Sequence, residues 1–246
     1  MKKFYGHEIP NLEAGELRGH LIIVEGADGA GRSTQVQLLR DWLERLGYPT
    51  IETGLKRSGL VGAELQEAMQ GNVLCPMTLS LFYATDLADQ IESNIVPALR
   101  AGFVVVADRY IYTLMARDIV RGASTQWLKK VFGFALVPDV VVYLKVRPTI
   151  LAERSFQKDG QLDYWESGMD IQRSGDMYQC FVRYQNRIAR AYARLSKEYD
   201  FEMVDGGKDP LEIHRHIREL VRPVVTSSAP RGVEGQPAAY VARDRE

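Results

Sequence analysis

A glycine-rich segment at residues 26–34 has the residue types of a loop that binds phosphate. Glycines allow successive backbone N–H groups to turn toward one anion, and a helix that starts near Ser33 adds its N-terminal partial positive charge. The guanidinium of Arg32 would reach phosphate oxygens, and the hydroxyl of Ser33 would ligate Mg²⁺. The residues expected to bind phosphate are Gly26, Asp28, Gly29, Ala30, Gly31, Arg32, Ser33 and Thr34.

The cation of this loop is arginine, where the pattern usually has lysine. A guanidinium is a bulkier, planar donor rather than a compact point charge. An accidental glycine-rich turn is the alternative, but the spacing and the apolar run before the loop favour phosphate binding. Whether Arg32 supports fast phosphoryl transfer stays open at this point.

A second candidate functional motif follows another apolar run and has the sequence Asp108-Arg109-Tyr110. The carboxylate of Asp108 is placed to hold a water of Mg²⁺. The guanidinium of Arg109 is placed to bridge two phosphates as charge spreads over the transferred group. The alternative is an internal ion pair that only secures the end of the strand. The position at a strand end beside the phosphate loop favours the functional interpretation.

The elements that must position these groups alternate between strand and helix. The strands are apolar without a polar face, which predicts a parallel sheet covered on both sides. Ligands of such sheets bind beyond the carboxyl ends of the strands, here after residues 24, 53, 107 and 144. Strands are expected at 20–25, 49–53, 102–108, 138–144 and 201–205, and helices at 33–46, 61–70, 76–100, from 113, 126–134, 149–158, 177–199 and 210–221.

Composition limits the function classes that remain. The chain has 246 residues, of which 46% are hydrophobic, and 31 basic residues balance 32 acidic ones. A net charge of −1 provides no basic field for nucleic acid. No targeting segment and no apolar run of about 20 residues is present, so neither export nor a membrane span is expected. Cys75 and Cys180 form no paired motif, which fits a reducing cytoplasm and argues against structural zinc or disulfides.

Three regions are expected along the chain. Residues 1–19 form a polar leader, residues 20–225 form one domain, and residues 226–246 form a disordered tail.

Four stretches, 24–35, 81–84, 95–110 and 160–163, resemble the thymidylate kinase family of nucleoside monophosphate kinases. The resemblance covers about residues 20–222. It implies an α/β fold of the P-loop NTPase type, a three-layer sandwich with a central parallel sheet and helices on both faces. It also implies a lid at about 154–176, and a homodimer packed through residues 79–98 or 127–136. The implied reaction transfers the γ-phosphoryl group of Mg·ATP to dTMP and gives dTDP.

The resemblance also implies a role for individual side chains. Asp28 would accept a hydrogen bond from the 3′-hydroxyl of the acceptor sugar, Arg57 would clamp its phosphate, and Phe82 would stack on its base. Phe82 as plain core and Arg57 as a solvated loop cation are the alternatives. The implied catalytic residues are Arg32, Asp108, Arg109, Arg154 and Lys158, and the implied Mg²⁺ ligands are Ser33 and Asp108, partly through water.

Departures from the family pattern cluster on the acceptor side. Asp86 takes the place of an arginine, and Arg117 would supply the missing charge. Tyr164 takes the place of a lid arginine. The sequence therefore leaves open two further readings: a kinase of this fold for another small acceptor, and a nucleotide-binding protein with little activity. The full set of expected acceptor-binding residues is Asp28, Arg57, Phe82, Asp86, Arg109, Thr113, Arg117 and Asp118.

Overall fold

The computed structural model describes residues 3–9, 17–71, 74–171 and 175–226. Within them, five strands form one sheet in the order β2-β3-β1-β4-β5. Every neighbouring pair is parallel, which confirms the sheet type predicted from the unbroken apolar runs. The strands are β1 (His20–Gly26), β2 (Thr50–Gly54), β3 (Val104–Asp108), β4 (Val140–Lys145) and β5 (Glu202–Asp205).

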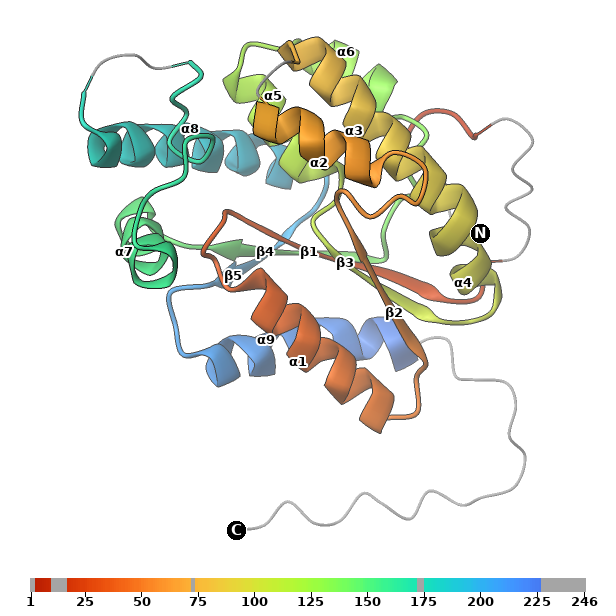
Figure 1. The fold of residues 1–246 in the computed structure, drawn as a ribbon. Coiled ribbons are helices and arrows are strands. Elements are labelled where there is room, and N and C mark those ends of the chain that lie inside the picture. Colours follow the sequence, from red (N-terminus) through yellow and green to blue (C-terminus); the bar gives the residue numbers. More distant parts are fainter. Residues whose placement is uncertain (1–2, 10–16, 72–73, 172–174, 227–246) are drawn as a thin grey trace, which may run out of the picture.

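Helices cover both faces of this sheet, which gives the expected three-layer sandwich (Figure 1). On one face lie α1 and α9, and on the other lie α3, α5 and α8. The described helices are α1 (Arg32–Arg45), α2 (Gly62–Gly71), α3 (Pro76–Gln90), the π-helical turn η1 (Ile91–Ile95), α4 (Val96–Arg100), α5 (Ile111–Val120), α6 (Thr125–Val131), α7 (Pro148–Asp159), α8 (Met177–Glu198) and α9 (Pro210–Thr226).

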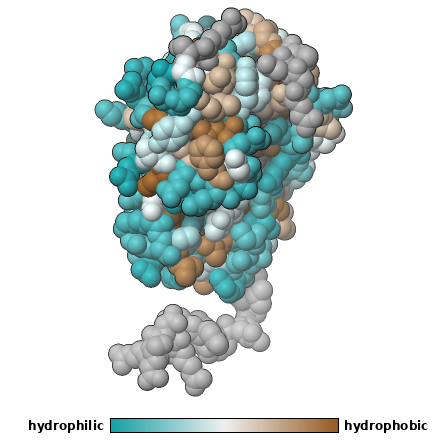
Figure 2. All heavy atoms as spheres, turned by 60° about the vertical axis from the view of Figure 1, so that its left-hand side comes forward, coloured by the Kyte–Doolittle hydropathy of each residue, from teal (hydrophilic) through white to brown (hydrophobic). Residues whose placement is uncertain are grey.

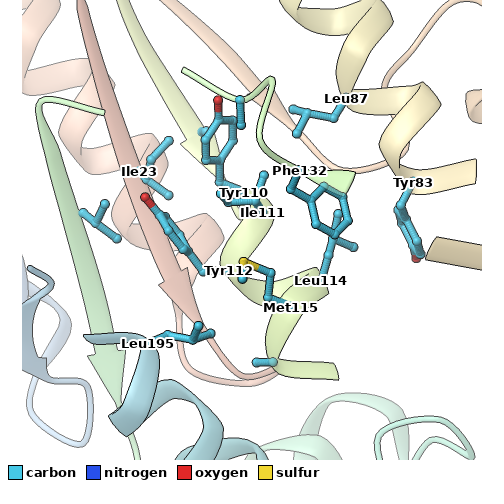
Figure 3. Close-up of a cluster of buried hydrophobic side chains, with 14 of the residues drawn as sticks. Ile23, Tyr83, Leu87, Tyr110, Ile111, Tyr112, Leu114, Met115, Phe132 and Leu195 are labelled. Carbon is cyan, nitrogen blue, oxygen red and sulfur yellow. The ribbon is translucent and has the colours of Figure 1, made fainter. Parts of the chain in front are cut away.

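Strand β1 is the centre of the sheet and is buried on both faces. Leu21 and Ile23 point into the core beneath α3, α5 and α8, whereas Ile22 and Val24 point into the core beneath α1 and α9. Figure 3 shows the first of these cores, to which β1 contributes Ile23 and to which α5, α8 and α3 contribute further side chains. Because two apolar layers hold β1, the loop that follows it starts from a fixed point.

Two helices differ most from the sequence expectation. The single helix expected at 76–100 is interrupted by η1, directly before Val96 and Pro97. Proline donates no backbone N–H and crowds the preceding turn, which accounts for the irregular turn there. The last helix continues past Val221 to Thr226, because Val225 extends the buried face of α9.

Residues 3–9 of the expected leader are packed against the domain. Phe4 forms a bridge with Leu136, and the backbone N–H of Tyr5 donates to the carbonyl of Ala135 at 3.0 Å. The Tyr5 hydroxyl lies 2.5 Å from the hydroxyl of Tyr112 at the start of α5. This part of the leader is therefore connected to the helix that follows β3. The expected tail was to begin at Thr226, but this residue ends α9, and residues 227–246 of the expected tail lie outside the described residues.

One buried carboxylate connects three elements at the carboxyl end of β1. Glu25, near the end of β1, is fully buried and accepts hydrogen bonds from the backbone N–H groups of Tyr110 and Thr113 at 2.8 and 3.2 Å. The hydroxyls of Thr113 and Tyr192 donate to its other oxygen at 2.6 and 2.8 Å. Burial raises the pKa of Glu25, and these donors offset part of that rise. The carboxylate thus ties β1 to the start of α5 and to α8.

Replacing Glu25 tests this connection. Glu25→Ala leaves two buried N–H groups without a partner and is expected to lower the free energy of unfolding by about 3–5 kcal/mol. Glu25→Gln should cost only about 1 kcal/mol, because its amide oxygen still accepts from the N–H groups and its amine can donate to the hydroxyls. Urea unfolding followed by circular dichroism measures both. The exposed Glu67→Ala serves as control, and equal unfolding midpoints for Glu25→Ala and Glu67→Ala would contradict the role of Glu25.

Candidate active site

The glycine-rich loop runs from the end of β1 to the first turn of α1. Gly29 and Gly31 have φ of +77° and +89°, a region that residues with a Cβ rarely adopt. Gly31 immediately precedes the 14-residue helix α1, so the loop ends at a helix N-terminus. The strand, loop and helix expected from the sequence are therefore in the order and geometry of an anion site.

Arg32 is folded against this loop, with its side chain only 9% exposed. Its Nε donates to Oδ1 of Asp108 at 2.7 Å, and its Nη1 donates to the carbonyl of Gly26 at 2.6 Å and to that of Ala27. Its Nη2 lies 3.4 Å from Oδ1 of Asp28. The guanidinium therefore connects the loop to Asp108 at the end of β3.

Asp108 and Ser33 together offer oxygen atoms at the mouth of the loop. The Ser33 hydroxyl lies 3.1 Å from Oδ2 of Asp108. Mg²⁺ in phosphate-binding sites takes one or two protein oxygens and completes its shell with water and phosphate. The described residues contain no cluster of three or more His, Cys, Asp or Glu with metal-site geometry. The oxygen pair therefore fits a magnesium ion that is held partly by phosphates.

Asp28 brings three guanidinium groups to one point. Its carboxylate pairs with Arg109, with Nη2 of Arg117 at 3.0 Å and with Nη2 of Arg32 at 3.4 Å. These arginines come from the end of β3, from α5 and from α1, all around the loop. Burial and the neighbouring charge of Arg117 lower the pKa of Arg109 to about 10, which still leaves it charged at neutral pH. Arg109 also has φ of +75°, a strained conformation for a residue with a side chain.

A pocket opens directly beside these charges. Its floor is the end of β1 and the loop, at Gly26, Ala27 and Asp28, and its walls are α3, α5 and α8. Tyr83 and Leu114, which Figure 3 shows on α3 and α5, belong to these walls. Further lining residues are Leu79, Thr113, Arg117, Asp118, Arg121, Trp165, Glu166, Asp170, Tyr184 and Tyr192. Apolar and aromatic walls with a charged floor suit a flat ring that carries a phosphate.

The segment after α7 covers one side of the pocket. Arg121, the residue directly after α5, holds this segment, because its Nε and Nη2 donate to the carboxylate of Asp170 at 2.8 and 3.2 Å. The same guanidinium donates to the hydroxyl of Tyr184 at 2.7 Å and lies 5.9 Å from the ring centre of Trp165. Gln185 donates to the carbonyl of Glu166 at 2.8 Å. These contacts attach the segment to α5 and α8.

The face that carries α7 and α8 is brought forward in Figure 2, and hydrophilic side chains cover most of it. Arg154 of α7 donates from Nη1 to the carbonyls of Gly29 and Gly206, both at 3.1 Å, so it contacts the phosphate loop. Lys158, one turn later, is 80% exposed and lies 3.8 Å from Asp159. Of the two expected lid cations, Arg154 contacts the loop and Lys158 points into solvent.

Three expected acceptor-binding residues are engaged elsewhere in the described structure. Asp86 is fully buried and accepts from the backbone N–H groups of Lys56 and Ser58 at 2.8 and 2.9 Å, so it anchors the loop after β2. Burial raises the pKa of Asp86, and these N–H donors oppose the rise. Arg57 pairs with Glu52 at 2.6 Å. Phe82 packs against the core of α3 and α5, and its neighbour Tyr83 is the aromatic that lines the pocket.

Thr113, Arg117 and Asp118 do lie at the pocket, as does Asp28. Sequence reasoning missed the part played by Glu25, Tyr83 and Arg121. A charged residue at the end of an apolar strand was the available signal for Glu25. Arg121 lies one helical turn after Arg117, a spacing that places both side chains on one face of α5.

The sequence was also compared with known proteins and protein families. Residues 24–217 match the family model described as thymidylate kinase. A probable thymidylate kinase 2 of Saccharolobus solfataricus is 36% identical over 86% of this chain and 100% of its own length. A probable thymidylate kinase of Pyrococcus abyssi is 27% identical over 84% of this chain and 97% of its own. A thymidylate kinase of Caldanaerobacter subterraneus is 29% identical over 83% and 96%.

The matched region spans the phosphate loop, the three arginines around Asp28, the pocket and the segment that covers it. By sequence and by fold, this chain belongs to the thymidylate kinase family.

Proposed function

We propose that this protein transfers the γ-phosphoryl group of ATP to dTMP and forms dTDP. Family membership and the names of the relatives support this reaction. The structural observation that carries it is the convergence of Arg32, Arg109 and Arg117 on Asp28, between the glycine-rich loop and the pocket. Two phosphate-bearing molecules would meet at this point.

The reaction demands positioning and charge neutralisation more than covalent chemistry. The loop 26–34 and the start of α1 would hold the phosphates of ATP. Arg109, which pairs with Asp28 at the floor of the pocket, would contact the acceptor phosphate and the transferred group. Arg117 would bind the acceptor phosphate from α5. When phosphates arrive, their oxygens replace the carboxylate of Asp28 as the partners of these guanidinium groups.

Magnesium is proposed as the cofactor, held by Ser33 and Asp108 partly through water. When bound, it would supply positive charge that stabilises the phosphates of ATP. Asp108 also orients Arg32, because its Oδ1 accepts a hydrogen bond from Arg32 while its Oδ2 lies beside the hydroxyl of Ser33. Asp108 thereby fixes the loop arginine and the oxygen pair in one arrangement.

The segment after α7 would exclude water from the transferred group, whose hydrolysis is the competing reaction. Arg154 already contacts the loop at Gly29. Lys158 would join the site only if α7 or the following segment moves, since its side chain is exposed.

Each of two alternative functions is supported by one observation. A different acceptor is favoured by Asp118, a carboxylate in the pocket wall. A protein with little activity is favoured by Arg32, because two of its nitrogens already bond the loop and Asp108. We favour phosphoryl transfer, because Nη2 of Arg32 keeps only a long contact to Asp28 and can turn to a phosphate.

Assembly and location are part of the proposal. A homodimer through α3 is supported by Met77 and Leu81, which are 62% and 47% exposed one turn apart on this helix. A cytoplasmic location is supported by Cys75 and Cys180, which are not joined in a disulfide. Within the described residues, no helix has the length and apolar character that crossing a bilayer requires. A net charge of −1 supports small nucleotides rather than nucleic acid as partners.

Release of ADP tests the reaction. The purified protein with Mg·ATP should release ADP with dTMP, and chelation of the metal should abolish turnover until Mg²⁺ is restored. The assay is run with one natural nucleoside monophosphate at a time. Turnover with a different acceptor would move the function within the family, and ATP binding without turnover on any acceptor would favour the low-activity alternative.

Variants at Arg32 test the loop cation. Arg32→Ala removes charge stabilisation from the transferred phosphoryl group and is expected to lower kcat about 10²- to 10³-fold. Arg32→Lys should be intermediate, because lysine keeps the charge but cannot brace Gly26 and Asp108 together. Steady-state kinetics with varied ATP measure both, and Arg45→Ala on the same helix is the control. Full kcat in Arg32→Ala would rule out a role of this residue in transfer.

Variants at Arg117 test how the acceptor phosphate is bound. Arg117→Ala removes a cation from the pocket and should raise KM for dTMP about 10- to 100-fold, while KM for ATP changes little. The exposed Arg190→Ala on α8 is a matched control for loss of positive charge. An unchanged KM for dTMP would show that Arg117 does not bind the acceptor.

A further inference from the structure

Residues 163–170 form a compact turn on one side of the pocket, and we call them the cover segment. One carboxylate oxygen of Asp163 accepts from the backbone N–H groups of Trp165 and Glu166 at 2.8 and 3.0 Å. Three further backbone N–H groups donate to carbonyls within the segment at 3.0–3.1 Å, those of Ser167, Gly168 and Met169. The cover segment therefore has a hydrogen-bonded structure of its own, although it belongs to no helix or strand.

Arg121 joins the cover segment to the end of α5. Its guanidinium donates to both carboxylate oxygens of Asp170 at 2.8 and 3.2 Å and to the hydroxyl of Tyr184 at 2.7 Å. It also lies 5.9 Å from the ring centre of Trp165. The side chains of Arg121 and Asp170 are only 9% and 14% exposed, so removal of either one would leave a charge that is largely shielded from water without its partner. Three kinds of contact therefore connect Arg121 to this segment and to α8.

Gly168 brings the cover segment close to α8. Its φ is +61°, and a Cβ at this position would lie 2.4 Å from the ring of Tyr184. A side chain larger than hydrogen therefore fits there only if the segment moves away from the ring. Gln185, the next residue of α8, donates to the carbonyl of Glu166 at 2.8 Å. Because Tyr184 contacts both Gly168 and Arg121, the attachments to α5 and α8 form one unit.

The cover segment supplies three residues to the lining of the pocket, which are Trp165, Glu166 and Asp170. The contacts that hold these residues are between groups of the protein itself, so none of them requires a bound nucleotide. A lid that closes only over its substrate would instead depend on contacts with that substrate.

We propose that Arg121 is a positioning residue, which holds the cover segment as a fixed wall of the pocket before the acceptor nucleotide binds. This inference rests on the proposed function and adds how the acceptor side of the site is kept in place. A wall that is already ordered spares the acceptor the entropic cost of ordering it, which strengthens binding. Closure over the transferred phosphate is then left to α7, which carries Arg154 and Lys158.

Hydrogen–deuterium exchange, measured by mass spectrometry on the protein without nucleotide, tests whether the wall is in place. In the wild type, amides of the cover segment should exchange at least about tenfold more slowly than those of an unstructured chain, and saturating dTMP should slow them little further. In Arg121→Gln they should exchange rapidly and become slow again when dTMP is added. Wild-type amides that exchange at the unstructured rate until dTMP binds would overturn the proposal, because the segment would then be a lid that closes on its ligand.

Arg187→Gln is the matched control for this measurement. Arg187 of α8 donates from Nη2 to the carbonyl of Val120 at 2.5 Å, so it also joins α8 to the end of α5. Its replacement removes an arginine and a contact between these helices but leaves Arg121 and Asp170 in place. Exchange in the cover segment should therefore match the wild type. Equal acceleration in Arg187→Gln and Arg121→Gln would show that Arg121 has no particular role.

Kinetic constants separate positioning from general damage. Arg121→Gln should raise KM for dTMP about tenfold while kcat and KM for ATP change by less than about twofold, because a saturating acceptor still orders the segment. Gly168→Ala, which displaces the segment with Arg121 intact, should have the same effect. Asp170→Asn should add little in the Arg121→Gln background, since both changes break one pair. An unchanged KM for dTMP in Arg121→Gln and Gly168→Ala would overturn the proposal.

Failure of the proposed function would give a different result. A wild type that neither binds nor phosphorylates dTMP would overturn that function, and the acceptor role of the wall with it. A wild type that phosphorylates dTMP but exchanges rapidly in the cover segment without nucleotide would overturn only the fixed wall.

Discussion

Hydrogen bonds to one buried carboxylate, that of Glu25, connect the elements that surround the candidate active site. Glu25 leaves β1 inside the core, and its four donors come from the start of α5 and from α8. A buried carboxylate is tolerated only when such donors are present, so the elements that supply them are fixed with respect to β1. Arg109, Tyr110 and the first turn of α5 follow from that placement. The loop on one side and the pocket on the other therefore share one anchor.

Charge balance around Asp28 is a second organising feature. Three guanidinium groups would repel one another without an anion between them, and a single carboxylate serves all three. Such an arrangement suits the phosphate binding that we propose, because a phosphate would take the place of an anion that the protein already holds. The strained backbone of Arg109 belongs to the same arrangement, since its φ of +75° is maintained by the contacts around it.

Much of this could be predicted from the sequence, for definite reasons. The parallel sheet follows from apolar runs without alternation, and the phosphate loop follows from glycine spacing between a strand and a helix. The residues on the acceptor side of the site were harder to predict from the sequence. Asp86 looked like a misplaced charge, but it is a buried acceptor for the loop after β2, and sequence spacing does not reveal such a long-range contact. Adjacent residues such as Phe82 and Tyr83 differ by about 100° around a helix, so a small error in its orientation exchanges core for pocket. The roles assigned to single site residues remain predictions.

The docked start of the chain has a consequence for how α5 is held. Tyr5 packs edge-on against Tyr199 with ring centres 5.1 Å apart, and its hydroxyl meets that of Tyr112. Tyr112 is the second residue of α5, directly before Thr113, which bonds Glu25. Residues 3–9 therefore pack behind the helix that forms one wall of the pocket. A substitution at Tyr5 is therefore expected to disturb the start of α5, the helix that also carries Arg117 and Asp118.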